Sequence, residues 1–293
     1  MYRDLFTEYG AINKLEHSFQ QGVVSYIERC RLEDGGYFFA RVLPSSGMDT
    51  YCAVKSLFLL GIKPDRSEDV AGFFLNQTED GSLGGITGLF YAVEVLHELG
   101  QITDEFRNYA GSQLCPLQNK AGGFGAYENV DVEVPSELQD TYRAVRTLNI
   151  IKRDLDREKV GRFVAGFLNP DGGYGSKGYS TLSSTFYATA IYRLLRLHNL
   201  GMTATKGYLR RREQYWQVQF IEDLYWLVEG LANLSEKPIY PDRFTMFVLE
   251  CQRHNGGFSR ATIMGIPTLE YTYYAISILK KTGALHFSPE QER

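Results

Sequence analysis

Pairs of adjacent glycines recur along this 293-residue chain, and four of the five pairs stand directly before an aromatic residue. The pairs are Gly35-Gly36, Gly84-Gly85, Gly122-Gly123, Gly172-Gly173 and Gly256-Gly257. After each pair comes an apolar stretch with an alanine near its start. Repetition of one unit at a period of roughly 20–50 residues is typical of repeat architectures. The glycine pairs therefore predict a fold built from one recurring unit.

Aligning the alanines sets the number of units. Ala53, Ala92, Ala144, Ala188 and Ala275 recur at a spacing of roughly 40–50 residues, with one empty place between the last two. Residues 222–234 fill that place with the same apolar pattern but without a glycine pair. We interpret this segment as a degenerate fifth unit of six.

Two helices are expected in each unit. The apolar stretches after the glycine turns predict inner helices, at residues 50–61, 89–100, 141–152, 185–196, 222–234 and 271–283. Amphipathic segments between them predict half-exposed outer helices, at residues 19–31, 67–77, 103–115, 157–168 and 241–252. No long stretch alternates with the period of a strand. With no polar capping unit at either end, we expect an all-α, closed α6/α6 toroid of about twelve helices, forming one domain over residues 1–293.

Composition excludes several classes of protein. The net charge is −4 and no basic run is longer than Arg210-Arg211-Arg212, which argues against nucleic-acid binding. Neither a signal peptide nor an apolar stretch long enough to span a membrane is evident. The four cysteines are far apart and form no CxxC pair, so we expect reduced thiols and a cytoplasmic location.

The glycine loops predict where a ligand binds. If the same loop precedes every inner helix, all six helices run parallel and their positive N-terminal ends share one mouth of the ring. Asp49-Thr50 and Asp140-Thr141 are expected to be N-caps there. Three basic residues follow glycine turns and are expected to bind an anion such as a diphosphate: Arg41, Lys177 and Arg260.

Aromatic residues make up 14% of the chain and are expected to line the interior below that mouth. Such rings suit a hydrocarbon chain and stabilise a carbocation through their π faces. The candidates for substrate binding are Tyr51, Tyr142, Tyr187, Tyr225, Trp226, Tyr271 and Tyr274.

The repeated GGF or GGY turn, followed by Asp-Thr and an apolar helix, resembles the prenyltransferase/squalene-cyclase repeat superfamily. The resemblance extends from about Phe19 to Ala284. It implies a toroid with an isoprenoid-sized centre, of the kind found in protein prenyltransferase β subunits and terpene cyclases.

Two signatures of that superfamily are altered. The resemblance implies a zinc site at Asp223-Leu224-Tyr225 and near Tyr271, but tyrosines replace its cysteine and histidine. One carboxylate does not make a zinc site, so we expect neither a metal nor another cofactor. The resemblance also places a cyclase acid motif at residues 137–141, where Gln139 occupies the proton donor's position. The candidate catalytic residues are Asp140, Glu137, Asp49 and Asp223, and Glu133 lies near them in the sequence.

Three functional hypotheses follow. The first is a prenyltransferase-like enzyme without the usual zinc, which binds an isoprenoid diphosphate or another apolar small molecule. The second is a class II-type terpene cyclase that uses a Glu/Asp cluster. The third is a non-catalytic toroid that binds a lipid or a protein partner resembling an α subunit.

Overall fold

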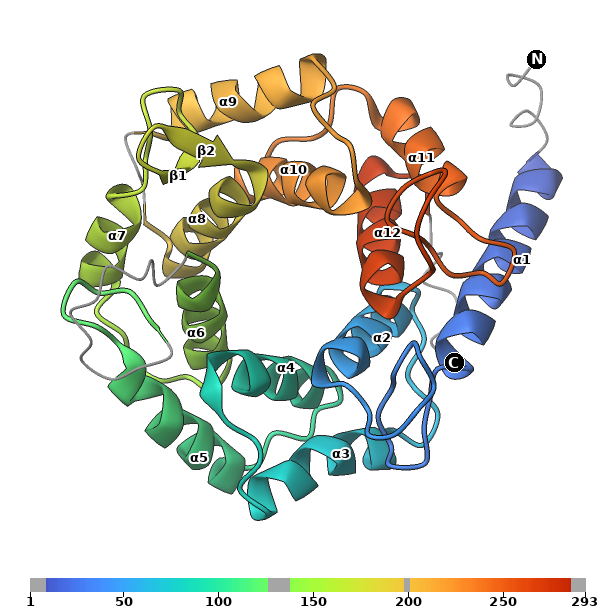
Figure 1. Cartoon of the computed structure of the whole chain (residues 1–293), viewed down its shortest axis with the longest axis horizontal. Helices are drawn as coiled ribbons and strands as arrows, with labels where there is room; N and C mark the ends of the chain where they lie inside the picture. Colours follow the sequence, from blue (N-terminus) through green and yellow to red (C-terminus); the bar gives the residue numbers. More distant parts are fainter. Residues whose placement is uncertain (1–8, 126–137, 198–200, 286–293) are drawn as a thin grey trace.

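The computed structural model describes residues 9–125, 138–197 and 201–285. Within these residues twelve α-helices form two concentric rings (Figure 1). The inner helices are α2 (Gly47–Leu59), α4 (Gly85–Glu98), α6 (Leu138–Ile150), α8 (Leu182–Leu195), α10 (Ile221–Asn233) and α12 (Leu269–Thr282). The outer helices are α1 (Tyr9–Glu28), α3 (Ser67–Glu79), α5 (Asp104–Leu114), α7 (Arg157–Ala165), α9 (Met202–Gln214) and α11 (Pro241–Glu250).

The inner ring is closed. Each inner helix packs against the two beside it, and α12 packs against α2. Side chains at equivalent places of neighbouring helices meet, as Lys55 of α2 meets Glu94 of α4. The six helices are therefore parallel and in register. We call the end of the ring at which they begin the upper mouth and the opposite end the lower mouth. The all-α toroid with about twelve helices is confirmed.

Glycine turns join four of the units to the unit that follows. The first glycine of four pairs has a left-handed backbone: Gly35, Gly122, Gly172 and Gly256. A Cβ at these positions would lie 2.1–2.6 Å from a backbone carbonyl oxygen of the following outer helix. For Gly256 the carbonyl belongs to Gly22 of α1, so the last turn packs against the first helix. Only a residue without a side chain permits this approach.

A threonine in the first turn of the inner helix holds each of these four turns. The backbone N–H of Tyr37 donates to Thr50 Oγ1 at 2.9 Å, and that of Tyr174 donates to Thr185 Oγ1 at 3.0 Å. The same bond links Phe124 to Thr141 and Phe258 to Thr272. The four aromatic side chains are buried: Tyr37, Phe124, Tyr174 and Phe258.

These bonds correct the predicted N-caps. Ser46, not Asp49, caps α2, because its side chain accepts from the N–H of Asp49 at 3.2 Å. Asp49 and Thr50 lie inside the first turn of the helix. Asp140 likewise lies inside the first turn of α6. The threonine bonds to the glycine turn from within the first turn of the helix. The helix therefore begins, and is capped, several residues before the threonine.

Two units depart from the pattern. Gly84 and Gly85 form no glycine turn, since they are the N-cap and first residue of α4 after a short connection. In the fifth unit a short connection also joins α9 to α10, and the sequence interpretation named no outer helix where α9 lies. The fourth unit adds a small hairpin of β1 (Tyr174–Ser176) and β2 (Tyr179–Thr181). A short 3-10 helix, η2 (Cys115–Leu117), follows α5.

None of the helices described is both long enough and apolar enough to cross a membrane.

Replacing Gly256 by alanine should destabilise the protein by at least about 3 kcal/mol, because the new methyl group would collide with the backbone of α1. Gly178 is a matched control, since its φ is +78° but nothing lies within 4 Å of its Cβ position. Gly178→Ala should cost only about 1–2 kcal/mol. Urea unfolding of both variants measures the difference, and equal costs would contradict the proposed role of the turn.

Candidate active site in the centre of the ring

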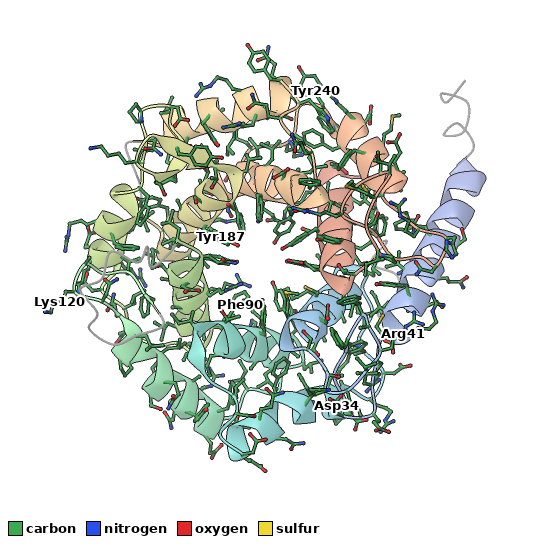
Figure 2. The ribbon with its side chains drawn as sticks, in the orientation of Figure 1. Asp34, Arg41, Phe90, Lys120, Tyr187 and Tyr240 are labelled. Carbon is green, nitrogen blue, oxygen red and sulfur yellow. The ribbon has the colours of Figure 1, made fainter. Side chains whose placement is uncertain are left out.

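Six aromatic rings form a belt around the lumen, the space enclosed by the inner helices. Each inner helix contributes one residue from the same place, two positions before the aligned alanine or, in α10, before Leu227. The belt consists of Tyr51, Phe90, Tyr142, Phe186, Tyr225 and Tyr273. Neighbouring centroids lie 5.4–6.1 Å apart all the way round. Figure 2 shows Phe90 directed from α4 toward the centre of the ring.

The belt tyrosines are neutral. Burial raises the pKa of the Tyr51, Tyr142 and Tyr225 hydroxyls well above the ordinary value. The hydroxyls of Tyr225 and Tyr273 lie 3.3 Å apart and form a hydrogen bond. The belt thus offers π faces to the lumen without adding charge.

Below the belt, toward the lower mouth, the lumen wall is charged and paired. Glu94, only 2% exposed, accepts hydrogen bonds from Lys55 and Arg146. On the other side Glu229 accepts from Ser277 Oγ at 2.7 Å. These residues stand two positions after the aligned alanine or its equivalent, one turn below the belt. Their mutual neutralisation leaves little free charge to bind a ligand.

Above the belt the wall combines aromatic rings with a few polar groups. Arg143 donates to Thr87 Oγ1 at 2.8 Å, and its guanidinium lies 5.8 Å from the centroid of the Tyr91 ring. Tyr274 OH donates to Glu270 Oε1 at 2.8 Å. This upper part of the lumen faces the mouth where the helices begin.

Asp49, in the first turn of α2, is the unusual acid near the upper mouth. Its side chain is in the first turn of α2 and only 1% of the residue is exposed. Oδ1 is buried and has no hydrogen-bond partner among the described residues. The pKa of Asp49 is raised to about 6, chiefly by burial; a hydrogen bond from the Phe39 backbone opposes the rise, and the charge of Glu270 adds to it. A carboxyl group with such a pKa keeps part of its protons near neutral pH.

The predicted catalytic acids that the structure describes lie in different environments. Asp140 lies 3.5 Å from Arg143 and is about one-third exposed. Asp223 accepts from the backbone N–H groups of Gln219 and Phe220, so it caps the start of α10. Glu137, like Glu133, lies outside the described residues. Of the three acids that the structure describes, Asp49 alone is buried with an unpaired oxygen.

The predicted aromatic residues reach three levels of the wall. Tyr51, Tyr142 and Tyr225 belong to the belt. Tyr187, Trp226 and Tyr274 come one position later, and Figure 2 shows Tyr187 directed inward from α8. Tyr274 stacks on Tyr225 with centroids 4.3 Å apart. Tyr271 lies in the first turn of α12, where the Thr268 side chain caps it.

Sequence reasoning missed half of the belt. Phe90, Phe186 and Tyr273 were not selected, although each stands two positions before an aligned alanine. That shared position was the available signal. Arg143 and Glu270 in the upper wall were missed as well.

The three basic residues predicted to share a site do not meet. Arg41 lies on the loop before α2, away from the lumen (Figure 2), where it interacts with the thiol of Cys30. Lys177 is exposed at the turn of the β1–β2 hairpin. Arg260 pairs with Glu222 at 2.6 Å and covers the Phe220 ring. They belong to the loops around the upper mouth and build no common anion site.

No group of three or more His, Cys, Asp or Glu side chains suited to a metal ion occurs in the described parts of the chain. Asp223 and Tyr225, predicted near an altered zinc site, instead cap α10 and join the belt.

A surface pocket of about 580 Å³ lies outside the ring, between α1 and the turn after α11. The arginines that line it donate hydrogen bonds to backbone carbonyl oxygens and so stabilise the fold. Arg29 donates to the backbone oxygen of Asn255 at 2.7 Å, and Arg253 donates to those of Ala261 and Thr262. The pocket therefore lies where the outer ring closes, between its first helix, α1, and the turn that follows its last helix, α11.

Comparisons with known proteins agree with this geometry. The family model described as the prenyltransferase alpha-alpha toroid domain matches residues 5–88, 76–217 and 217–290. A search of curated proteins gives no match.

Several solved structures share the fold. A Candida albicans protein geranylgeranyltransferase-I complexed with GGPP is 18% identical, with a TM-score of 0.66 and 92% of each chain covered. A variant of the type II terpene cyclase MstE from Scytonema, in complex with its substrate geranylgeranyl dihydroxybenzoate, is 12% identical, with a TM-score of 0.65 and coverage of 95% of this chain and 100% of that one. A protein from Actinoplanes is 12% identical, with a TM-score of 0.59 and coverage of 92% and 99%.

The raised pKa of Asp49 predicts a pH-dependent stability. The folded protein binds this proton more tightly than the unfolded chain, so wild-type stability falls as the pH rises from about 4 to about 6 and is then level with respect to this group. Asp49→Asn should therefore be more stable than wild type at pH 7, by up to about 3 kcal/mol, and lose most of that advantage at pH 4. Denaturant unfolding at both pH values measures the effect. An advantage that does not change with pH would mean that Asp49 has an ordinary pKa.

Proposed function

Because the chain belongs to the prenyltransferase α/α toroid family, we propose that it is an isoprenoid-binding enzyme of the cyclase type that starts its reaction by protonating an alkene from Asp49. The observation that carries the proposal is the buried, unpaired Oδ1 of Asp49 together with its pKa of about 6. This choice puts forward the cyclase hypothesis ahead of the transferase hypothesis.

The substrate is a polyprenyl chain bound in the upper lumen. The aromatic belt forms the lower boundary of this site, and the Tyr274 hydroxyl reaches up to Glu270 in the first turn of α12. Burying a hydrocarbon chain against such rings contributes roughly 25 cal/mol per Å² of apolar surface. The charged residues below the belt are already paired with one another. A hydrocarbon chain that entered deeper would therefore contact polar groups without forming a favourable interaction with them.

The chemical step needs only a proton. The Asp49 carboxyl transfers its proton to one carbon of an alkene, and the π electrons of that alkene form the new C–H bond. The adjacent carbon becomes a carbocation, which the next alkene of the chain attacks to close a ring. Loss of a proton from the final cation restores a neutral product, so the overall change is an isomerisation without an added reactant. The belt rings stabilise the intermediate cations through their π faces.

A prenyltransferase-like enzyme is the second candidate, and Arg143 favours it. This guanidinium lies beside the Tyr91 ring, and the N-terminal ends of six helices add positive potential at that mouth. A diphosphate head group would bind at this place. The first candidate is preferred because Arg143 already binds Thr87 and pairs with Asp140.

A product assay tests the proposed function. We expect purified protein, incubated with geranylgeraniol or with farnesyl or geranylgeranyl diphosphate, to form cyclic isomers detectable by gas chromatography–mass spectrometry. In Asp49→Asn the product should fall by at least a hundredfold, since the amide has no acidic proton.

Asp223→Asn is the matched control, because Asp223 caps a helix at the same place of another unit. It should lose about 1 kcal/mol of stability and keep its activity. Equal product from wild type and Asp49→Asn would refute the role of Asp49. Transfer of the prenyl group to an acceptor, with release of diphosphate, would instead support the second candidate.

A further inference from the structure

The wall of the upper lumen carries two side chains of opposite charge on opposite helices. Arg143 belongs to α6 and Glu270 to α12, and these helices stand three places apart in the closed ring of six, so they face each other across the lumen (Figure 1). Both groups lie at the level of the first helical turns. Arg143 donates to Thr87 near the start of α4, and Glu270 is near the start of α12. A ligand that enters from the upper mouth passes between them before it reaches the belt.

The Tyr274 hydroxyl holds the Glu270 carboxylate on the lumen side of α12. It donates to Glu270 Oε1 at 2.8 Å, and its ring stacks on Tyr225 of the belt with centroids 4.3 Å apart. Glu270 is partly buried and forms no ion pair in the parts of the chain that the structure describes. A partly buried carboxylate that has a phenol but no cation as its partner favours a positively charged group in a ligand.

Arg143 provides the complementary charge on α6. Its guanidinium lies 5.8 Å from the centroid of the Tyr91 ring and 3.5 Å from Asp140. The Asp140 side chain is 32% exposed and that of Arg143 is 17% exposed, so the acid is the more solvated partner of this long ion pair. One partly paired guanidinium can bind a single carboxylate in a bidentate manner, but it does not balance the charge of a diphosphate.

The fields of both groups reach the same two tyrosines. Burial raises the pKa of Tyr91 on α4 and of Tyr187 on α8 to about 12. For each of these phenols the charge of Arg143 lowers the pKa, and the charge of Glu270 raises it. Tyr187 is directed toward the centre of the ring (Figure 2). The two fields therefore overlap in the upper lumen, which is polarised from Glu270 on α12 to Arg143 on α6.

We propose that the upper lumen binds amphiphiles with a zwitterionic head group, in which an ammonium group contacts Glu270, a carboxylate contacts Arg143 and the apolar tail lies against the belt. The rings of Tyr274 and Tyr225 beside Glu270 also suit the cation, because their π faces attract ammonium groups. N-alkyl amino acids are the simplest ligands of this class. The inference shares with the proposed function only the place of the ligand, and it does not depend on proton transfer from Asp49.

Head groups with one charge complement the site less well. A carboxylate alone gains Arg143 but is repelled by Glu270, and an ammonium group alone gains Glu270 but is repelled by Arg143. A hydroxyl group forms hydrogen bonds to either side without a charge to match. The zwitterion satisfies both walls at once.

Calorimetric titration with four probes that share a farnesyl tail tests the proposal: farnesol, farnesylamine, farnesoic acid and N-farnesylglycine. Wild type should bind N-farnesylglycine at least about tenfold more tightly than farnesol, because two charge-assisted contacts are added. Glu270→Gln should weaken binding of N-farnesylglycine and farnesylamine by about tenfold, leave farnesol unchanged and strengthen farnesoic acid. Arg143→Gln should weaken N-farnesylglycine and farnesoic acid instead.

Matched controls come from the outer ring. Glu250 on α11 and Arg162 on α7 are exposed, so Glu250→Gln and Arg162→Gln should bind all four probes like wild type. Circular dichroism verifies that every variant is folded.

Three results would overturn the proposal. Equal affinity of wild type for farnesol and N-farnesylglycine would leave the lumen as a site for a hydrocarbon chain without a zwitterionic head. An affinity for farnesylamine that survives Glu270→Gln would place the cation elsewhere, such as over the belt. Binding of none of the probes would contradict the upper lumen as a ligand site altogether.

Asp49→Asn separates this inference from the proposed function. The variant should bind N-farnesylglycine like wild type while forming no cyclic product. Loss of head-group recognition and loss of chemistry are therefore observed independently.

Discussion

The close approach of each glycine turn to the backbone of the next outer helix organises the whole molecule. At Gly256 the turn packs against α1, so the contact that joins neighbouring units also closes the chain on itself. The threonine bond from the inner helix fixes the same turn from the other side. One short segment therefore sets the relation between an inner helix, its own loop and the following unit. Repeating that relation leads to a ring with parallel inner helices.

The functional asymmetry of the lumen follows from this arrangement. Because the helices are parallel and in register, one sequence position becomes one level of the wall. Aromatic residues two positions before the alanine form a belt, and charged residues two positions after it form paired groups below. Asp49 lies in the first turn of α2, near the upper mouth, and is buried close to Tyr26 and Cys30 at the end of α1. The belt therefore separates an aromatic upper region, suited to a hydrocarbon and its cations, from a polar lower region.

The sequence predicted the fold well because its determinants are local. A glycine pair, a threonine and an alanine recur at visible spacing, and the number of units follows from them. The site was less predictable. Phe90 and Phe186 join the belt through their register, and sequence inspection favoured tyrosines. Asp49 was expected to cap its helix, and only the packing reveals its burial and raised pKa. Arg41, Lys177 and Arg260 were expected to converge, but the ring places their loops around the mouth.

A crystal structure of the protein with a farnesyl or geranylgeranyl compound tests the central claim most directly, because that claim concerns where a polyprenyl chain lies. We predict continuous density for the chain in the upper lumen, against the belt formed by Tyr51, Phe90, Tyr142, Phe186, Tyr225 and Tyr273, with an alkene carbon within contact distance of Asp49 Oδ1. Density between the belt and the Lys55–Glu94–Arg146 cluster, or in the surface pocket beside α1, would contradict the account.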